Sequence, residues 1–289
     1  MACGCGRSPD SCRGWHLLSE EEFQEELKIY EKEQKLETKA KAKKEKEKYH
    51  EVTVTEVHHY TESLFRIRTT KPNGYSFRAG EFAMIGMRDR LRRAYSFTSA
   101  PKDDFLEFYS IKVPDGAFTS RLKYIQPGDL MEVGKTPTGT LVEDYLTPNG
   151  RRLWLMATGT GIAPFMSLIR QRDIFKNYKE VFVTWTVRKP RDLAAYKSFI
   201  LNTTSVTLFP TVTQDPTYIG HQGRIQNYLK PNTQSANYLP ELDPELDRVM
   251  LCGSMEFNND IKELLEAKGF EEGNTNTQGT YLLEKAFVG

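Results

Sequence analysis

The stretch that most constrains the fold is an apolar run, a glycine turn and a second apolar segment over residues 153–174. Leu153–Ala157 is apolar at every position, which is typical of a strand buried on both faces of a parallel sheet. Thr158–Gly161 interrupts the run, and from Ile162 the pattern favours a helix with Pro164 in its first turn. Glycines let a backbone turn sharply and approach a ligand, and the amides at a helix start favour a phosphate. We expect a strand–turn–helix unit, which is either a nucleotide site or an ordinary turn.

The composition narrows the class of protein. A length of 289 residues allows one long domain or two ordinary ones. The net charge of +1 does not favour binding to a nucleic acid or to an acidic membrane through the overall charge of the protein. No segment is apolar and long enough to span a bilayer, and the first residues lack the apolar segment of a secretory signal. We therefore expect a cytoplasmic protein.

Three of the four cysteines stand within the first twelve residues. With one histidine they form a soft-metal ligand set: Cys3, Cys5, Cys12 and His16. Such a set could hold a [2Fe-2S] cluster or zinc, or could be a tail with reduced thiols. The spacing resembles that of the CDGSH iron-sulfur family, although Arg13 and Trp15 depart from its motif. We expect a small metal or iron-sulfur module over residues 1–18.

Residues 19–48 are rich in charge. Ser19 and Glu22 have the spacing of a capping box, in which each residue satisfies an amide of the other at a helix start. Residues 39–48 hold six lysines against two glutamates, which is typical of a solvated helix or linker. A docking arm for an acidic partner is the alternative. We expect a charged helical linker.

From residue 49 the pattern changes to short alternating segments separated by turns. We expect strands over 52–57, 64–68, 82–87, 93–98, 105–113 and 130–133. Many short strands with frequent turns favour a closed antiparallel barrel. The turn cluster Thr147–Gly150 would end this domain, which we place at residues 49–148.

The remainder, residues 149–289, alternates apolar runs with segments of helical pattern. Further strands are expected over 181–187, 207–213, 248–252 and 281–283, with a helix over 255–268. This order predicts a doubly wound parallel sheet, whose ligands bind at the carboxyl ends of the strands. Gly159, Thr213 and Cys252 all stand at such ends, which favours nucleotide binding.

Two segments of the first half could hold a diphosphate and a flat ring. In Arg93-Ala94-Tyr95-Ser96 the guanidinium suits a diphosphate, the tyrosine an aromatic ring and the serine a ring nitrogen. Residues 116–122 resemble a helix start with the hydroxyls of Thr119 and Ser120 at its N-terminus. An ordinary barrel strand and an ordinary cap are the alternatives.

Several motifs occur in one order along the chain: Arg93–Ser96, Tyr109–Gly116, Thr136–Leu141, Gly159–Pro164, Leu251–Ser254 and Glu284–Gly289. Together they resemble the ferredoxin/flavodoxin–NADP(H) reductases of the bacterial type, over residues 50–289. The resemblance implies an FAD-binding barrel followed by an NADP-binding α/β domain. It also implies an oxidoreductase that passes electrons between NADP(H) and ferredoxin or flavodoxin.

The resemblance also implies the roles of individual residues. FAD would be bound by Arg93, Ala94, Tyr95, Ser96, Tyr109, Ile111, Lys112, Phe118, Thr119, Ser120, Ala286, Phe287 and Val288. NADP would be bound by Gly159, Thr160, Gly161, Cys252, Gly253 and Ser254. Catalytic roles would fall to Ser96 near the flavin N5, Cys252 beside the nicotinamide, Glu284 in proton and electron transfer, and Ala286 at the flavin-stacking position. We expect Cys252 to position the nicotinamide rather than to act as a covalent nucleophile.

Two features concern the choice of dinucleotide and partner. The 2′-phosphate of NADP needs cationic contacts, and Gln214 stands where related reductases often have arginine. Arg188 and Arg224 are then the candidates, and we favour NADP over NAD. Arginines 88, 90, 92 and 93 could form a basic rim that attracts an acidic ferredoxin or flavodoxin, or could simply be solvated. The alternative function is an NAD(P)H reductase that serves an oxygenase or another acceptor, with the N-terminal module as a docking element.

Overall fold

The computed structural model describes residues 18–87, 91–113, 116–195, 197–229 and 239–285. The chain divides after Tyr49 into an N-terminal unit and a larger compact unit, His50–Gly289. We describe the two units separately.

The N-terminal unit contains one long helix, α1, over Glu20–Glu47. Its start is a capping box, as expected: the Glu22 carboxylate accepts hydrogen bonds from the Ser19 amide at 2.9 Å and from the Ser19 hydroxyl at 2.8 Å. The Ser19 hydroxyl in turn accepts the Glu22 amide at 3.4 Å. Ile29 and Leu36 are exposed, so the described side chains of the helix include apolar groups left in water.

The larger unit begins with a six-stranded antiparallel sheet. Its strands are β1 (Tyr49–His59), β2 (Leu64–Thr70), β3 (Phe82–Gly86), β4 (Arg92–Ser96), β5 (Phe105–Ile111) and β6 (Leu130–Gly134), in the order β4-β3-β6-β1-β2-β5. The outer strands β4 and β5 meet where Phe97 bridges Phe108 and the Thr98 amide donates to the Glu107 carbonyl at 2.9 Å. The sheet is therefore nearly closed, and the predicted antiparallel barrel is confirmed in that form.

Alternate residues of these strands fill the barrel. Phe65, Ile67, Phe97 and Phe108 are fully buried, and Phe97 stacks on Phe77 with 4.0 Å between ring centroids. Burial of each such side chain contributes about 1.5–3 kcal/mol. The period-two alternation that predicted these strands thus reflects an apolar interior.

The second sheet is parallel throughout. Its strands are β7 (Arg152–Thr158), β8 (Glu180–Val187), β9 (Val206–Val212), β10 (His221–Gln222), β11 (Asp247–Gly253) and β12 (Tyr281–Lys285), in the order β10-β9-β8-β7-β11-β12. The chain order reverses between β7 and β11, and ligands of such sheets bind at this switch point. Gly159 and Cys252 therefore stand at the predicted place.

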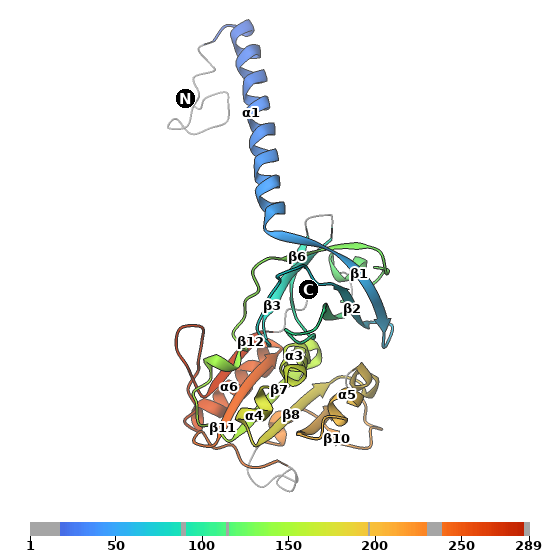
Figure 1. The fold of residues 1–289 in the computed structure, drawn as a ribbon, viewed down its shortest axis with the longest axis vertical. Coiled ribbons are helices and arrows are strands. Elements are labelled where there is room, and N and C mark those ends of the chain that lie inside the picture. The colour runs from blue at the N-terminus through green and yellow to red at the C-terminus, as the bar shows by residue number, and fades with distance from the viewer. Residues whose placement is uncertain (1–17, 88–90, 114–115, 196, 230–238, 286–289) are drawn as a thin grey trace. The chain divides into compact units, whose positions relative to one another are not determined.

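Helices cover both faces of the parallel sheet (Figure 1). They are α3 (Ala163–Gln171), α4 (Ile174–Asn177), α5 (Lys197–Leu201) and α6 (Met255–Ala267), with short 3-10 segments η3 (Glu143–Tyr145), η4 (Gly159–Ile162), η5 (Pro190–Ala195) and η6 (Ile225–Asn227). On β7, Leu155 faces the cluster that contains α3, whereas Trp154 faces the cluster that contains α6. The continuous apolar run of β7 is thus explained by burial on both faces, as predicted.

Two predicted elements differ in detail. The helix expected from residue 116 is only the four-residue α2 (Thr119–Leu122). Phe118, directly before it, is fully buried with the barrel core. The strand expected over 93–98 ends at Ser96.

Candidate functional site

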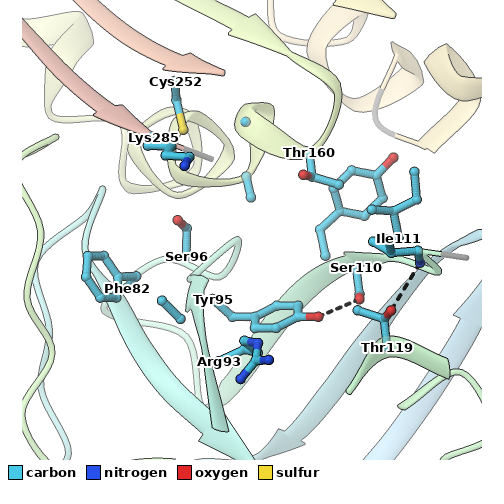
Figure 2. Close-up of a pocket in the computed structure, with 15 residues that line it drawn as sticks. Phe82, Arg93, Tyr95, Ser96, Ser110, Ile111, Thr119, Thr160, Cys252 and Lys285 are labelled. Atoms are coloured by element: carbon cyan, nitrogen blue, oxygen red, sulfur yellow. Dashed lines mark hydrogen bonds between the residues drawn. The ribbon is translucent and has the colours of Figure 1, made fainter. Parts of the chain in front are cut away.

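One cavity lies between the ends of the two sheets. Its lining comes from both, and consists of Phe82, Arg93, Ala94, Tyr95, Ser96, Tyr109, Ser110, Ile111, Val113, Thr119, Thr160, Gly161, Ala163, Cys252 and Lys285. Figure 2 shows the Ser96 hydroxyl and the Cys252 sulfur both directed into this space, from the barrel and from the parallel sheet respectively. The structure thus brings together ten residues predicted from separate motifs.

The two glycines of the turn after β7 have different tasks. Gly159 has φ +52°, in the left-handed region that favours glycine, and no atom lies within 4 Å of where a Cβ would stand. A Cβ on Gly161 would lie 2.0 Å from the Cys252 carbonyl oxygen. Gly161 is therefore required for packing against β11, whereas the expectation had been that both glycines admit a ligand. The indole N–H of Trp185 donates to the Gly159 carbonyl at 2.9 Å and steadies the turn from β8.

The barrel supplies an aromatic ring in a fixed orientation. The hydroxyl groups of Tyr95 and Ser110 are hydrogen-bonded at 2.9 Å (Figure 2). Burial raises the pKa of Tyr95 to about 12, so the phenol stays neutral. Arg93 lines the same wall and donates to the Arg92 carbonyl at 2.9 Å. A guanidinium, a flat ring and the Ser96 hydroxyl thus stand in sequence along the edge strand β4.

The hydroxyl group of Thr119, which was expected at a helix start, stabilises a loop instead. The Thr119 hydroxyl accepts the Val113 amide at 3.1 Å, so it ties down its own loop. No side chain caps α2, and Phe118 points into the barrel core. Ser120 and Lys112 are absent from the cavity lining, and their amides donate to the carbonyls of Gly116 and Ser63. The ordinary cap, which was the alternative for this segment, is therefore absent, and Thr119 lines the cavity.

The carboxyl end of the parallel sheet places a thiol next to a carboxyl. Cys252 on β11 pairs in register with Glu284 on β12. Cys252 is 2% exposed, and burial together with the nearby Glu284 raises the pKa of its thiol well above the ordinary value. The thiol is neutral, which fits a positioning group better than a nucleophile.

Burial also raises the pKa of the Glu284 carboxyl, to about 7, against the opposing effect of its hydrogen bonds from Thr140. The Thr140 amide donates to Glu284 Oε2 at 3.0 Å, and the Thr140 hydroxyl donates to the Leu283 carbonyl at 2.9 Å. The side chain of Asn258 donates to the Glu284 carbonyl at 3.0 Å. These contacts attach the Glu284 carboxyl to the barrel segment 136–141 and the Glu284 main chain to α6.

The sequence did not single out several of these residues. Phe82, Ser110 and Lys285 line the cavity, and Thr140 and Asn258 orient Glu284. Ser110 and Thr140 lie within motif stretches quoted above, so their position in those stretches was an available signal. The role of Asn258 depends on tertiary contact alone.

Gly253 and Ser254 contribute to the packing and the capping of helix α6. A Cβ on Gly253 would lie 2.4 Å from the Phe257 ring. The Ser254 hydroxyl accepts the Phe257 amide at 3.3 Å and caps α6.

The candidates for a 2′-phosphate contact fall into two places. Arg188 and Gln214 are adjacent after β8 and β9, because the Gln214 amide donates to the Arg188 carbonyl at 2.9 Å. Lys189, which the sequence reasoning missed, donates to the Gln214 carbonyl at 2.6 Å. Arg224 is paired with Glu256 at 2.6 Å. Both places therefore carry a cationic side chain that already has a protein partner.

One of the four arginines expected to form a basic rim is neutralised by an ion pair. Arg92 pairs with Glu132 at 2.6 Å, and its side chain is only 10% exposed. Arg88 and Arg90 lie outside the described residues.

Several predicted residues also lie outside the described part of the chain: Cys3, Cys5, Cys12, His16, Ala286, Phe287 and Val288. Among the residues that are described, no group of three or more histidine, cysteine, aspartate or glutamate side chains is arranged to hold a metal ion. Within the same residues, no helix has the length and hydropathy needed to cross a membrane.

Comparison with known proteins agrees with this geometry. Residues 155–263 match the family model described as the oxidoreductase NAD-binding domain. The ferredoxin–NADP reductase A of Sorangium cellulosum is 43% identical over 257 residues, which cover 83% of this chain and 91% of that protein. The flavodoxin/ferredoxin–NADP reductase of Rhodobacter capsulatus is 40% identical over 253 residues, 82% of this chain and 93% of that protein.

A solved structure is also similar. The ferredoxin–NADP+ reductase of Neisseria gonorrhoeae, determined with bound FAD and NADP, superposes with a TM-score of 0.77 at 29% identity. The match covers 83% of this chain and 99% of that one.

Proposed function

This chain belongs to the ferredoxin/flavodoxin–NADP reductase family, and from this premise we propose that it moves electrons between NADP(H) and ferredoxin or flavodoxin through bound FAD. The observation that carries the proposal is the single cavity that joins Arg93, Tyr95 and Ser96 to the Thr160–Gly161 turn and Cys252. Such a cavity allows two cofactors to meet. We assign residues 49–148 to the flavin half and residues 149–289 to the nicotinamide half.

The residues of the barrel wall fit FAD. Arg93 would hold the diphosphate, Tyr95 would lie against the flavin ring, and Ser96 would stand near its reactive nitrogen. The hydrogen bond from Tyr95 to Ser110 restricts the ring before the cofactor arrives, which lowers the ordering cost of binding. When bound, FAD accepts a hydride from NADPH, leaving NADP+, and returns the two electrons one at a time to two equivalents of a one-electron acceptor.

The chain controls protons and geometry around this exchange. Cys252, as a neutral buried thiol, would hold the nicotinamide in place without forming a covalent bond. Glu284 has a pKa of about 7, so its carboxyl can hold or release a proton at neutral pH. The Thr140 amide keeps Glu284 Oε2 oriented whether the carboxyl holds the proton or has released it.

We further propose that the dinucleotide is NADP. The support is the adjacency of Arg188, Lys189 and Gln214 at the ends of β8 and β9, where two cationic side chains and one amide could meet a 2′-phosphate. The ratio of kcat/KM for NADPH to that for NADH tests this choice. We expect a large ratio, and a value near one would count against it.

The N-terminal set Cys3, Cys5, Cys12 and His16 is proposed as a soft-metal module, with a [2Fe-2S] cluster ahead of zinc, which would relay single electrons or serve docking. Its support is the donor set alone. Iron and sulfide assays on anaerobically purified protein test it, and zinc in stoichiometric amount without sulfide would exclude the cluster.

The central experiment is a visible spectrum of the purified protein followed by anaerobic reduction with NADPH. We expect flavin bands that bleach on addition of NADPH and recover when ferredoxin or flavodoxin is added. A colourless protein that cannot be reconstituted with FAD would overturn the proposed function. Recovery with neither acceptor would favour a reductase for an oxygenase or another acceptor.

A further inference from the structure

Helix α3 connects the dinucleotide turn with a second set of contacts to the barrel. The helix starts at Ala163, directly after the turn, and ends at Gln171. In its second half the Ser167 hydroxyl donates to the Ser99 carbonyl at 2.7 Å, and the Arg170 guanidinium pairs with the Glu107 carboxylate at 2.9 Å. These two contacts, which we call the α3 anchor, tie an element of the parallel sheet to the barrel.

The α3 anchor is buried, and this distinguishes it from ordinary surface contacts. The side chain of Ser167 is fully buried and that of Glu107 is 0% exposed, while Arg170 is 16% exposed. A hydrogen bond or ion pair away from water depends strongly on geometry, because a misplaced buried polar group loses its partner without regaining solvent. The α3 anchor therefore resists sliding of the helix over the barrel.

Glu107 is held from the barrel side as well. Its carboxylate accepts hydrogen bonds from Arg66 at 2.9 Å, from Arg68 at 2.7 Å and from the Thr98 hydroxyl at 2.8 Å. Burial alone would raise the pKa of this carboxyl, but the guanidinium groups, Arg170 first among them, bring it below its ordinary value. Glu107 is thus ionised in the folded protein, and Arg66, Arg68 and Thr98 hold it from the barrel side.

The barrel segments in the α3 anchor are also those that line the site. Ser99 follows Ser96 by three residues, and Glu107 precedes Tyr109 by two on β5. At the other end of the path, Gly161 packs against the Cys252 carbonyl so closely that a Cβ would lie 2.0 Å from it. A continuous route of tight contacts therefore runs from the barrel wall, along α3, to the turn and β11.

We propose that Ser167 and Arg170 are positioning residues for hydride transfer, which hold the Gly159–Gly161 turn at a set distance from Tyr95 and Ser96. This inference rests on the proposed function, in which NADPH is oxidised at the turn and FAD is reduced at the barrel wall. Hydride transfer needs the reacting atoms in near-contact, and a displacement of about 1 Å can slow a reaction by about 100-fold. The α3 anchor fixes this displacement from outside the cavity, on the side of the turn, while Thr140 ties the barrel to β12.

The test compares Ser167→Ala, Arg170→Met and the double variant with the unchanged protein, all loaded with FAD. Arg170→Met leaves Glu107 paired with Arg66 and Arg68, so the fold should persist. Arg172→Met is the matched control, because it removes the same charge from the same end of α3 and has no contact with Glu107 among those described. Arg170→Lys, which retains the charge, is the rescue variant.

In single-turnover reduction by NADPH we expect each single variant to be about 10-fold slower and the double variant about 100-fold slower. FAD content and the Kd for NADP+ should change less than about twofold. Arg170→Lys should recover most of the rate, and Arg172→Met should match the unchanged protein.

One readout does not depend on turnover. Amide hydrogen exchange in residues 159–163 should accelerate in the Ser167→Ala and Arg170→Met variants. Wild-type rates and exchange in both variants would overturn the inference, as would an equal loss in Arg172→Met. If the protein without substitutions does not take up FAD, the proposed function is refuted. Hydrogen exchange measured without FAD would still test the α3 anchor in that case.

Discussion

Glu284 provides a prediction whose size can be worked out from the structure. The carboxyl is half-buried between Cys252 and Thr140, and its pKa is raised from 4.5 to about 7. Between these two pH values the folded protein keeps a proton that the unfolded chain releases. Stability therefore falls as pH rises through this window, and the loss is complete above about pH 7.

The full shift corresponds to at most about 3 kcal/mol. Because the carboxyl remains partly exposed, solvent screening reduces this, and we expect a loss of about 1–2 kcal/mol at pH 8. The Glu284→Gln variant carries no titrating proton but can still accept the Thr140 amide. It should match the unchanged protein near pH 4.5 and be more stable by about 1–2 kcal/mol at pH 8.

Urea unfolding of the FAD-loaded protein and the variant, at equal FAD concentration and at several pH values, measures the difference. Glu263→Gln on the exposed face of α6 is the control, since it removes a carboxylate that lies in water. A constant difference between Glu284→Gln and the unchanged protein from pH 4.5 to pH 8 would refute the reasoning. It would mean that the carboxyl titrates alike in the folded and unfolded states.

Other substitutions test the remaining parts of the site. Cys252→Ala should retain FAD but slow single-turnover reduction by NADPH about tenfold, because the nicotinamide loses a positioning contact; an unchanged rate would remove Cys252 from the mechanism. Gly161→Ala should lower the free energy of unfolding by about 2–3 kcal/mol in urea titration, because its Cβ would strike the Cys252 carbonyl. Gly159→Ala, which meets no atom, should cost only about 1 kcal/mol of left-handed strain, and equal losses for both glycines would contradict this assignment. Replacing Arg188 and Lys189 together with alanine should raise the KM for NADPH about tenfold and leave the KM for NADH nearly unchanged; a parallel rise in both would place the 2′-phosphate elsewhere.

The sequence predicted the elements whose signals are local. The strand before the turn was expected at residues 153–157 and extends over Arg152–Thr158, because a strand buried on both faces is apolar at every position. The capping box at Ser19 depends on residues three apart, and it was found as expected. The barrel motif Arg93–Ser96 and the turn at Gly159–Gly161 were also recognised, and the motif lines one cavity together with Thr160 and Gly161 of the turn.

What the sequence missed depends on contacts between distant segments. The task of Gly161 is set by the Cys252 carbonyl, 91 residues further along. Arg92 was counted in a basic rim, but Glu132 from another strand neutralises it. Phe118 packs in the barrel core directly before the short helix α2, and no local pattern distinguishes that phenylalanine from an exposed one. Glu107 and Arg170, 63 positions apart, gave no signal at all.

The burial of Glu107 has a consequence for experiments at different ionic strengths. Dissolved ions screen exposed charges over about 8 Å at 0.15 M salt but have little effect on pairs that water does not reach. Glu107 is 0% exposed, so its pair with Arg170 should keep its geometry as salt is added. Salt should then leave the rate of hydride transfer at saturating NADPH unchanged while it slows the encounter with a charged protein acceptor. A titration with sodium chloride can therefore separate the chemical half of the electron path from the diffusional half without any mutation.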